Sequence, residues 1–284
     1  MPPDWGGLGF DAVWYADFYH HLIGDTDKGS DYAKLIKTAG LGDDRALAMD
    51  FFAGALQATN GGKKVVYHES HDEAGNGQFT HRTIHTAVNG APLIGATRKA
   101  AEARCRFAAG MAMLSAGLPM FLFGEEVGAE KDFLYGKVLE NREDLQGLKH
   151  GSGSHLFKFY ADLIRLRRGN PAINHENIDV VFVHNDHRLI AFRRWIGPYA
   201  EVLVVGSLNN QPFDKPSYVM HGDRLFGGRW REIFNSDAEI YGGDNVGNAG
   251  GIIENDNGTF ECVIPARGFV VFQKLVGRFG HVPT

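Results

Sequence analysis

The segment HESHDEAGN, residues 68–76, carries two histidines and three carboxylates in nine positions, directly after the apolar run KVVY at 64–67. A carboxylate in such a segment can stabilise an oxocarbenium-like transition state, and a neighbouring histidine can donate hydrogen bonds to sugar hydroxyls. Glu73, within the segment, is a candidate for substrate binding. Chemistry on a carbohydrate is therefore one interpretation of this segment, and aromatic residues near the strand ends, which could stack on sugar rings, favour it.

Three other interpretations of the segment compete with this one. Ser70, His71 and Asp72 are the three residue types of a hydrolase triad. Three consecutive residues, however, cannot place a nucleophile, a base and an orienting acid in one hydrogen-bonded chain. A metal site of His68, His71 and Asp72 is disfavoured, because histidines three apart in loop or extended chain diverge. For an isolated His-Asp pair, a structural role in satisfying loop backbone groups is about as frequent as a functional one. A row of ionisable residues after a buried strand favours function.

Further candidate substrate contacts follow two other apolar runs. Asp17 and His20 come after FDAVW at 10–14, and Glu125 comes after MFLF at 120–123. Trp14 offers a flat face for a sugar ring, although aromatic residues are more often part of a core. Asp17 and His20 could equally form a solvated face of a loop and helix. Glu125 could position a loop, line a subsite or form a carboxylate dyad with Asp72.

The elements that position these residues follow from the apolar pattern. All three apolar runs have the continuous β-branched or aromatic character of strands buried on both faces. Apolar residues at helical spacing predict long helices over 97–117 and 154–169, after the second and third runs. This alternation is typical of parallel β/α units, whose functional residues gather at the C-terminal ends of the strands.

After Pro171 the pattern changes to short strands separated by turn residues, which predicts an all-β sandwich. We therefore expect two domains, an α/β domain over 1–176 and an all-β domain over 177–284. We also expect the second domain to close its core between its own two sheets. Limited proteolysis should then leave a resistant core that begins near Asn177.

Composition excludes several classes of protein. The 284 residues are 44% hydrophobic and 22% charged, which suits a chain with a sizeable core. A net charge of -5 without runs of like charge argues against a nucleic-acid or membrane surface. Cys105 and Cys262 are predicted to be free, buried thiols in a reducing compartment, and no signal peptide is apparent, so we expect a cytoplasmic location. Nothing in the sequence implies a metal or an organic cofactor.

Several longer segments carry a resemblance. VVYHESHDEAGN at 65–76 and the stretch 81–129 resemble the seventh and eighth strand segments of the alpha-amylase family, especially its glycogen branching enzymes. GLGFDAVWYADFYHHLIGD at 7–25 resembles the sixth, and WREIFNSDAEIYGGDNVGN at 230–248 resembles the C-terminal β domain. The resemblance implies strands 6 to 8 of a (β/α)8 TIM barrel followed by a β-sandwich, with an α-1,4-glucan as partner. It implies that His71 binds substrate and that Asp72 is the third catalytic carboxylate.

The sequence departs from that family in one respect. The family's aspartate nucleophile and glutamate acid/base follow strands four and five, and the resemblance begins at strand six. A complete barrel takes about 250 residues, so we expect a fragment of a 1,4-alpha-glucan branching enzyme, a retaining transglycosylase that makes α-1,6 branches. Alone, such a fragment is expected to be inactive. The alternatives are a fragment of a maltooligosyl trehalose trehalohydrolase or another α-glucan hydrolase, and a non-catalytic glucan-binding remnant.

Overall fold

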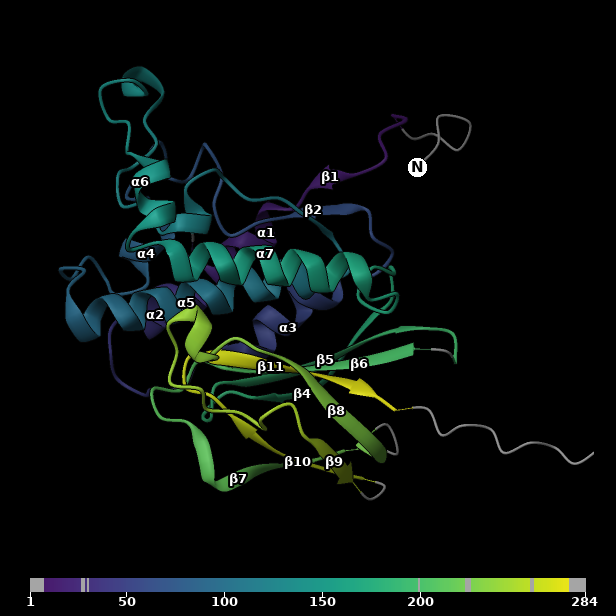
Figure 1. The fold of residues 1–284 in the computed structure, drawn as a ribbon. Coiled ribbons are helices and arrows are strands. Elements are labelled where there is room, and N and C mark those ends of the chain that lie inside the picture. Colours follow the sequence, from purple (N-terminus) through teal and green to yellow (C-terminus); the bar gives the residue numbers. More distant parts are fainter. Residues whose placement is uncertain are drawn as a thin grey trace, which may run out of the picture.

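The computed structural model describes residues 8–26, 29, 31–198, 200–222, 226–255 and 258–275 of the chain. Within them, three parallel strands lie on one side of a layer of helices and an antiparallel sheet lies on the other side (Figure 1). The outer ends of both predicted domains, 1–7 and 276–284, fall outside the described residues. None of the helices in the described ranges combines the length and apolar character needed to span a bilayer.

The first part of the chain is built from parallel β/α units, as predicted. Its three strands pair in the order β1-β2-β3. They are β1 (Val13–Trp14), β2 (Lys64–Val66) and β3 (Leu118–Pro119). The helices are α1 (Ala16–Leu22), α2 (Leu35–Ala39) and α3 (Met49–Gln57) after β1, α4 (Thr83–Thr86) and α5 (Gly95–Leu114) after β2, and η2 (Glu125–Val127), η3 (Tyr135–Lys137), α6 (Leu145–His150) and α7 (Ser154–Gly169) after β3.

Two expectations about these strands are wrong. The third strand is Leu118–Pro119 and not the run MFLF, in which only Met120 still bonds to the sheet, through its N–H to the Val66 carbonyl. The strands are also not all buried on both faces, since Val13 and Leu118 are 61% and 48% exposed. Both lie on strands that have a neighbour on one side only, whereas the end of the central strand, Val66, is fully buried.

The second part of the chain is antiparallel throughout. A six-stranded sheet has the order β4-β5-β6-β11-β8-β9, and β7 and β10 form a separate two-stranded sheet. The six-stranded sheet consists of β4 (Ile178–His184), β5 (Leu189–Ile196), β6 (Ala200–Ser207), β8 (Gly228–Asn235), β9 (Ile252–Asn255) and β11 (Gly268–Lys274). The two-stranded sheet pairs β7 (Phe213–His221) with β10 (Thr259–Ile264). A short helix, η5 (Glu239–Tyr241), follows β8.

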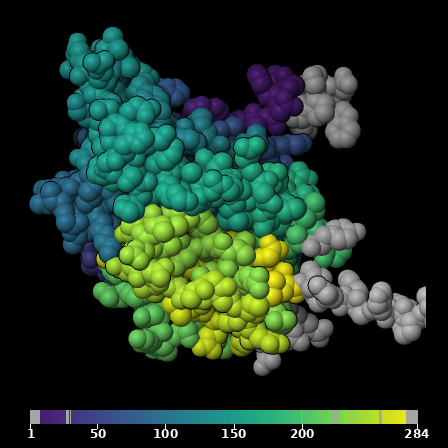
Figure 2. Space-filling model, in the orientation of Figure 1, coloured from purple at the N-terminus to yellow at the C-terminus, as the bar shows by residue number. Residues whose placement is uncertain are grey.

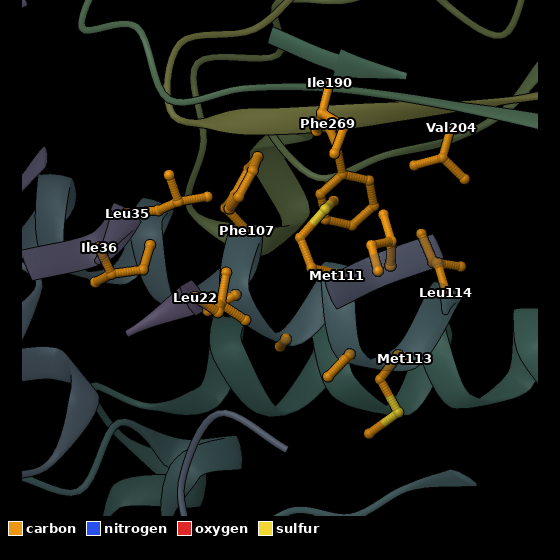
Figure 3. Close-up of a cluster of buried hydrophobic side chains, with 14 of the residues drawn as sticks. Leu22, Leu35, Ile36, Phe107, Met111, Met113, Leu114, Ile190, Val204 and Phe269 are labelled. Carbon is orange, nitrogen blue, oxygen red and sulfur yellow. The ribbon is translucent and has the colours of Figure 1, made fainter. Parts of the chain in front are cut away.

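The six-stranded sheet is buried on both faces. Leu203, Phe260 and Phe272 belong to a cluster between the two sheets. On the opposite face, Val204 and Phe269 join the cluster formed by the helices (Figure 3). This two-sided burial explains why β5, β6 and β11 contain nearly continuous apolar runs. The all-β part therefore has the expected core between its own two sheets, and its larger sheet also shares a second core with the helices.

Helix α5 and the sheet approach each other closely at one glycine. A Cβ on Gly110 would lie 2.1 Å from the Phe269 ring, so a residue without a side chain is required there. Phe107, one turn before Gly110, and Met111, the residue after it, pack in the same cluster (Figure 3). The all-β residues consequently lie directly against the helical residues in the space-filling view (Figure 2).

Two arginines, the buried Arg194 and the half-buried Arg167, hold the end of α5 in place. Arg194, on β5, donates from its guanidinium to the carbonyls of Leu114 and Ser115, and Arg167, on α7, donates to those of Met113 and Ser115. These carbonyls belong to the last turn of a helix, where no N–H of the helix itself can reach them. The two parts of the chain thus share hydrogen bonds as well as a core. Cys105 and Cys262 are free and buried, as predicted.

Candidate functional site

The segment 68–76 leaves the C-terminal end of β2, the central strand, where parallel β/α folds hold their functional residues. Its two central residues face solvent: the side chains of His71 and Asp72 are 49% and 61% exposed, with His71 Nε2 3.8 Å from Asp72 Oδ2. Asp72 N–H donates to Ser70 Oγ at 3.1 Å, which fixes the turn. A dissolved ligand can therefore reach both groups.

Two aromatic residues frame this pair. The Trp14 ring, from the end of β1, lies 5.8 Å from the His71 ring at 87°, and it is 46% exposed. The Tyr135 ring, from η3, lies 5.9 Å from His71 on a different segment of the chain, and its hydroxyl donates to Asp72 Oδ1. Trp14 was a sequence candidate and Tyr135 was not. The only signal for Tyr135 was its place in the aromatic run DFLYG, soon after Glu125 and Glu126.

Beneath the exposed pair lies a buried polar network. His68 Nε2 is 2.8 Å from Glu125 Oε2 and 2.9 Å from Tyr160 Oη, and its Nδ1 is 3.2 Å from Thr83 Oγ1. Burial lowers the pKa of His68, but the adjacent Glu125 carboxylate outweighs it, and the net pKa is raised. Glu125 also accepts from the Leu122 N–H at 2.7 Å. The network ties the segments after β2 and β3 to α7.

A second buried pair fixes the start of α4. Glu69 accepts from the Arg82 guanidinium at 2.8 Å and from the Thr83 N–H at 2.5 Å. The Arg82 guanidinium also donates to the Phe123 carbonyl at 3.2 Å, and this bond links the start of α4 to the segment after β3. Together the two networks hold His68 and Glu69 in place, and so they fix the position at which the following segment brings His71 and Asp72 to the surface.

The remaining sequence candidates are placed differently. Glu73 is half-buried and accepts from the Ser70 hydroxyl, and burial raises the pKa of Glu73. Asp17 is exposed and accepts from Tyr32 at 3.2 Å. His20 is buried, with Nδ1 3.0 Å from Thr26 Oγ1, and Glu125 is buried in the network described above. The structure thus gathers His71, Asp72 and Trp14, and their roles in binding stay predictions, as do those of the others.

The alternative metal site does not assemble. His68 is buried with both ring nitrogens close to protein oxygens, whereas His71 faces solvent. Among the residues that the structure describes, no three His, Cys, Asp or Glu side chains are grouped so as to hold a metal ion.

Comparison with known proteins accounts for both parts of the fold. A profile described as "Alpha amylase, C-terminal all-beta domain" matches residues 180–274. The 1,4-alpha-glucan branching enzyme of Aromatoleum aromaticum is 31% identical over 146 residues, which is 48% of this chain and 21% of that enzyme. That of Cereibacter sphaeroides is 27% identical over 262 residues, 88% of this chain and 31% of that enzyme. The chain is a distant homologue of the C-terminal region of branching enzymes in the alpha-amylase family.

Solved structures agree with this relationship at the level of the fold. Pullulanase from Bacillus acidopullulyticus has a TM-score of 0.60 at 17% identity, covering 93% of this chain and 30% of that one. Pullulanase from Anoxybacillus sp. LM18-11, solved with maltotriose, has a TM-score of 0.57 at 18% identity, covering 93% and 34%. A parallel β/α part followed by an antiparallel all-β domain is thereby confirmed.

The alignment to the Cereibacter branching enzyme covers 88% of this chain. The 12% of the chain left outside is too short to reach position 72 from the first residue, so the aligned span includes Asp72.

Proposed function

We propose that the end of β2 forms part of an α-1,4-glucan site of the branching-enzyme type. In this site Asp72 is the carboxylate that stabilises the positive charge of the transition state. His71 donates to a sugar hydroxyl, and Trp14 stacks on a sugar ring. The observation that carries the proposal is the exposed His71–Asp72 pair, framed by the rings of Trp14 and Tyr135. The relation to branching enzymes favours branching over trehalose release.

The reaction that we assign to this site type is retaining transglycosylation. Such a reaction needs a nucleophile and an acid/base besides the stabilising carboxylate. The resemblance assigns only Asp72 among these three in this sequence. Glu125 is a poor substitute, because His68, Tyr160 and the Leu122 N–H hold its carboxylate inside the fold. We therefore propose that the chain binds α-glucan and that, by itself, it neither branches nor hydrolyses it, since losing one member of a catalytic group costs orders of magnitude in rate.

Binding of maltoheptaose to the 284-residue chain, measured by titration calorimetry, tests the site. Trp14→Ala removes a stacking face and should weaken binding by about three- to tenfold, the range expected for aromatic contacts of about 0.5–1.5 kcal/mol. Trp195→Ala is the matched control, because Trp195 lies on β5 beside Arg193 in the all-β part. Equal effects of the two substitutions, or an absence of binding, would refute the glucan site.

An amylose assay tests the second half of the proposal. The expected result is no branching and no release of reducing ends above background. Turnover that disappears in both Asp72→Asn and Glu125→Gln would show instead that these two carboxylates act as a catalytic dyad.

A further inference from the structure

Two adjoining pockets run beside α4, outside the site at Asp72. Their volumes are ≈ 250 Å³ and ≈ 410 Å³, and His81, His85 and Gly90 line both. We call this continuous depression the α4 trench, with Asp25 and Phe79 at one end and Asp132 at the other. In size the trench falls among small-molecule sites, which occupy about 300–1,000 Å³.

Hydrogen bonds within the protein orient both histidines of the trench. His81 Nδ1 lies 2.8 Å from Asp132 Oδ2, and the His81 side chain is 58% exposed. His85 Nε2 lies 2.9 Å from the Glu130 carbonyl oxygen. A carboxylate or carbonyl oxygen can only accept, so the nitrogen that faces it carries the proton. In the neutral rings, His81 Nε2 and His85 Nδ1 are consequently left as acceptors for a ligand's O–H groups.

The far end of the trench combines a buried carboxyl group with an exposed ring. Asp25 is 3% exposed and accepts from the hydroxyl groups of Tyr19 and Thr86. Phe79 is 68% exposed and has φ 65, a left-handed conformation that is unusual for a bulky residue. Such strained residues cluster at binding sites, and an exposed aromatic face is suited to stacking.

The charges of the trench select the class of ligand. Lys37 and Lys131 line it together with the carboxyl groups of Asp25, Glu130 and Asp132, so the carboxyl groups outnumber the lysines. This excess of carboxyl groups would repel a phosphate, whereas a neutral polyhydroxylated molecule could donate to the carboxylates and to the histidines. The polar lining and the Phe79 ring therefore match a saccharide better than an anion.

We propose that the α4 trench is a second saccharide-binding site, with Phe79 as its stacking face and His81 and His85 as hydrogen-bond acceptors. That the saccharide is an α-glucan rests on the proposed function. The trench adjoins the first site through one segment: Asp132 packs against Gly75, and Tyr135, three residues later, donates to Asp72. One glucan chain could thus contact both sites.

Histidine-ring NMR of the ¹⁵N-labelled chain during maltoheptaose titration tests the trench separately from the first site. His81 and His85 report on the trench, and His71 reports on the site at Asp72. We expect all three rings to shift. Phe79→Ala should weaken the response of His81 and His85 by about three- to tenfold. Phe51→Ala is the matched control, because Phe51 is an exposed ring on α3, and it should leave the response unchanged.

The possible outcomes separate the two proposals. Shifts at His71 alone would overturn the trench and leave the proposed function standing. Shifts at His81 and His85 that are weakened by Phe79→Ala but not by Trp14→Ala, with His71 unmoved, would support the trench and overturn the proposed function. An absence of shifts at all three rings would overturn both. Inorganic phosphate that shifts His81 and His85 and competes with maltoheptaose would show an anion site in place of a saccharide site.

Discussion

Asp72 and Tyr135 are linked by a hydrogen bond between segments far apart in the sequence. The bond and the negative charge of Asp72 raise the pKa of Tyr135 to about 12, because they favour the neutral phenol. Asp72→Asn removes the charge and should lower the pKa of Tyr135 toward its ordinary value of about 10. The shift would appear as an earlier onset of the ¹³Cζ tyrosine titration by NMR. Asp17→Asn is the control, and an unchanged onset in Asp72→Asn would show that the bond does not form in solution.

His68 gives the fold a dependence on pH. Its net pKa is raised in the folded protein, with Glu125, Tyr160, Thr83 and Glu69 around it. Protonated His68 therefore contributes stability below the unfolded pKa of about 6.5, and this contribution is lost as the pH rises through the raised value. At pH values above the raised pKa of His68, the wild-type chain should therefore unfold at a lower urea concentration.

The same measurement on two variants isolates the contribution of His68. His68→Gln should flatten the fall in the urea midpoint, because the group that loses its proton is gone. His150→Gln replaces an exposed histidine of α6 and should keep the wild-type slope. An identical slope in His68→Gln would assign the pH dependence to other groups.

The sequence predicts only part of the site because only part of it is local. His71 and Asp72 follow directly from their place after a strand. Tyr135 bonds to Asp72 across 63 positions and Tyr160 reaches His68 across 92, so packing and not pattern brings them together. The sequence did not predict the burial of His20 and Glu125 for the same reason, because a position after a strand does not determine which way the side chain faces.

At the scale of elements, the helices were easier to predict than the strands. The spacing of apolar residues predicts 154–169, and α7 spans those residues, because long periodic segments carry a strong signal. The third strand was placed two residues too late. Arg82 donates a hydrogen bond to the Phe123 carbonyl, and Gly124, with φ 98, leads the chain into η2, so the apolar run MFLF leaves the sheet. Neither the hydrogen bond nor the backbone angle can be predicted from the residues of the run itself.

The contact between α5 and β11 depends on Gly110. Gly110→Ala forces a methyl group into the Phe269 ring, which is fully buried and cannot move aside. Such overpacking typically costs about 1–3 kcal/mol, to be measured by urea denaturation of the whole chain. Gly54→Ala in α3 is the control, because nothing lies within 4 Å of its added Cβ, and it should be neutral or gain up to about 1 kcal/mol. Equal stability changes in the two variants would refute the close contact.

At the scale of the whole molecule, the six-stranded sheet serves two cores. One face packs against the β7–β10 sheet and the other against the helices. Arg194 adds hydrogen bonds from β5 to the last turn of α5. The predicted division at residues 176 and 177 therefore separates two topologies, while the side chains on either side of it form one structural unit.

Residues 177–284 produced alone should consequently not form a stable monomer. Removing the helices exposes the face that holds Ile190, Val204 and Phe269, all fully buried in the whole chain (Figure 3). Each such side chain loses about 1.5–3 kcal/mol of burial, a large share of a stability of about 5–15 kcal/mol. We expect aggregation or dye-binding exposed surface, measured by size-exclusion chromatography and ANS fluorescence. Residues 95–284, which keep α5 and α7, should bind less dye. A monomeric, cooperatively unfolding 177–284 would show that the sheet does not need its helical face.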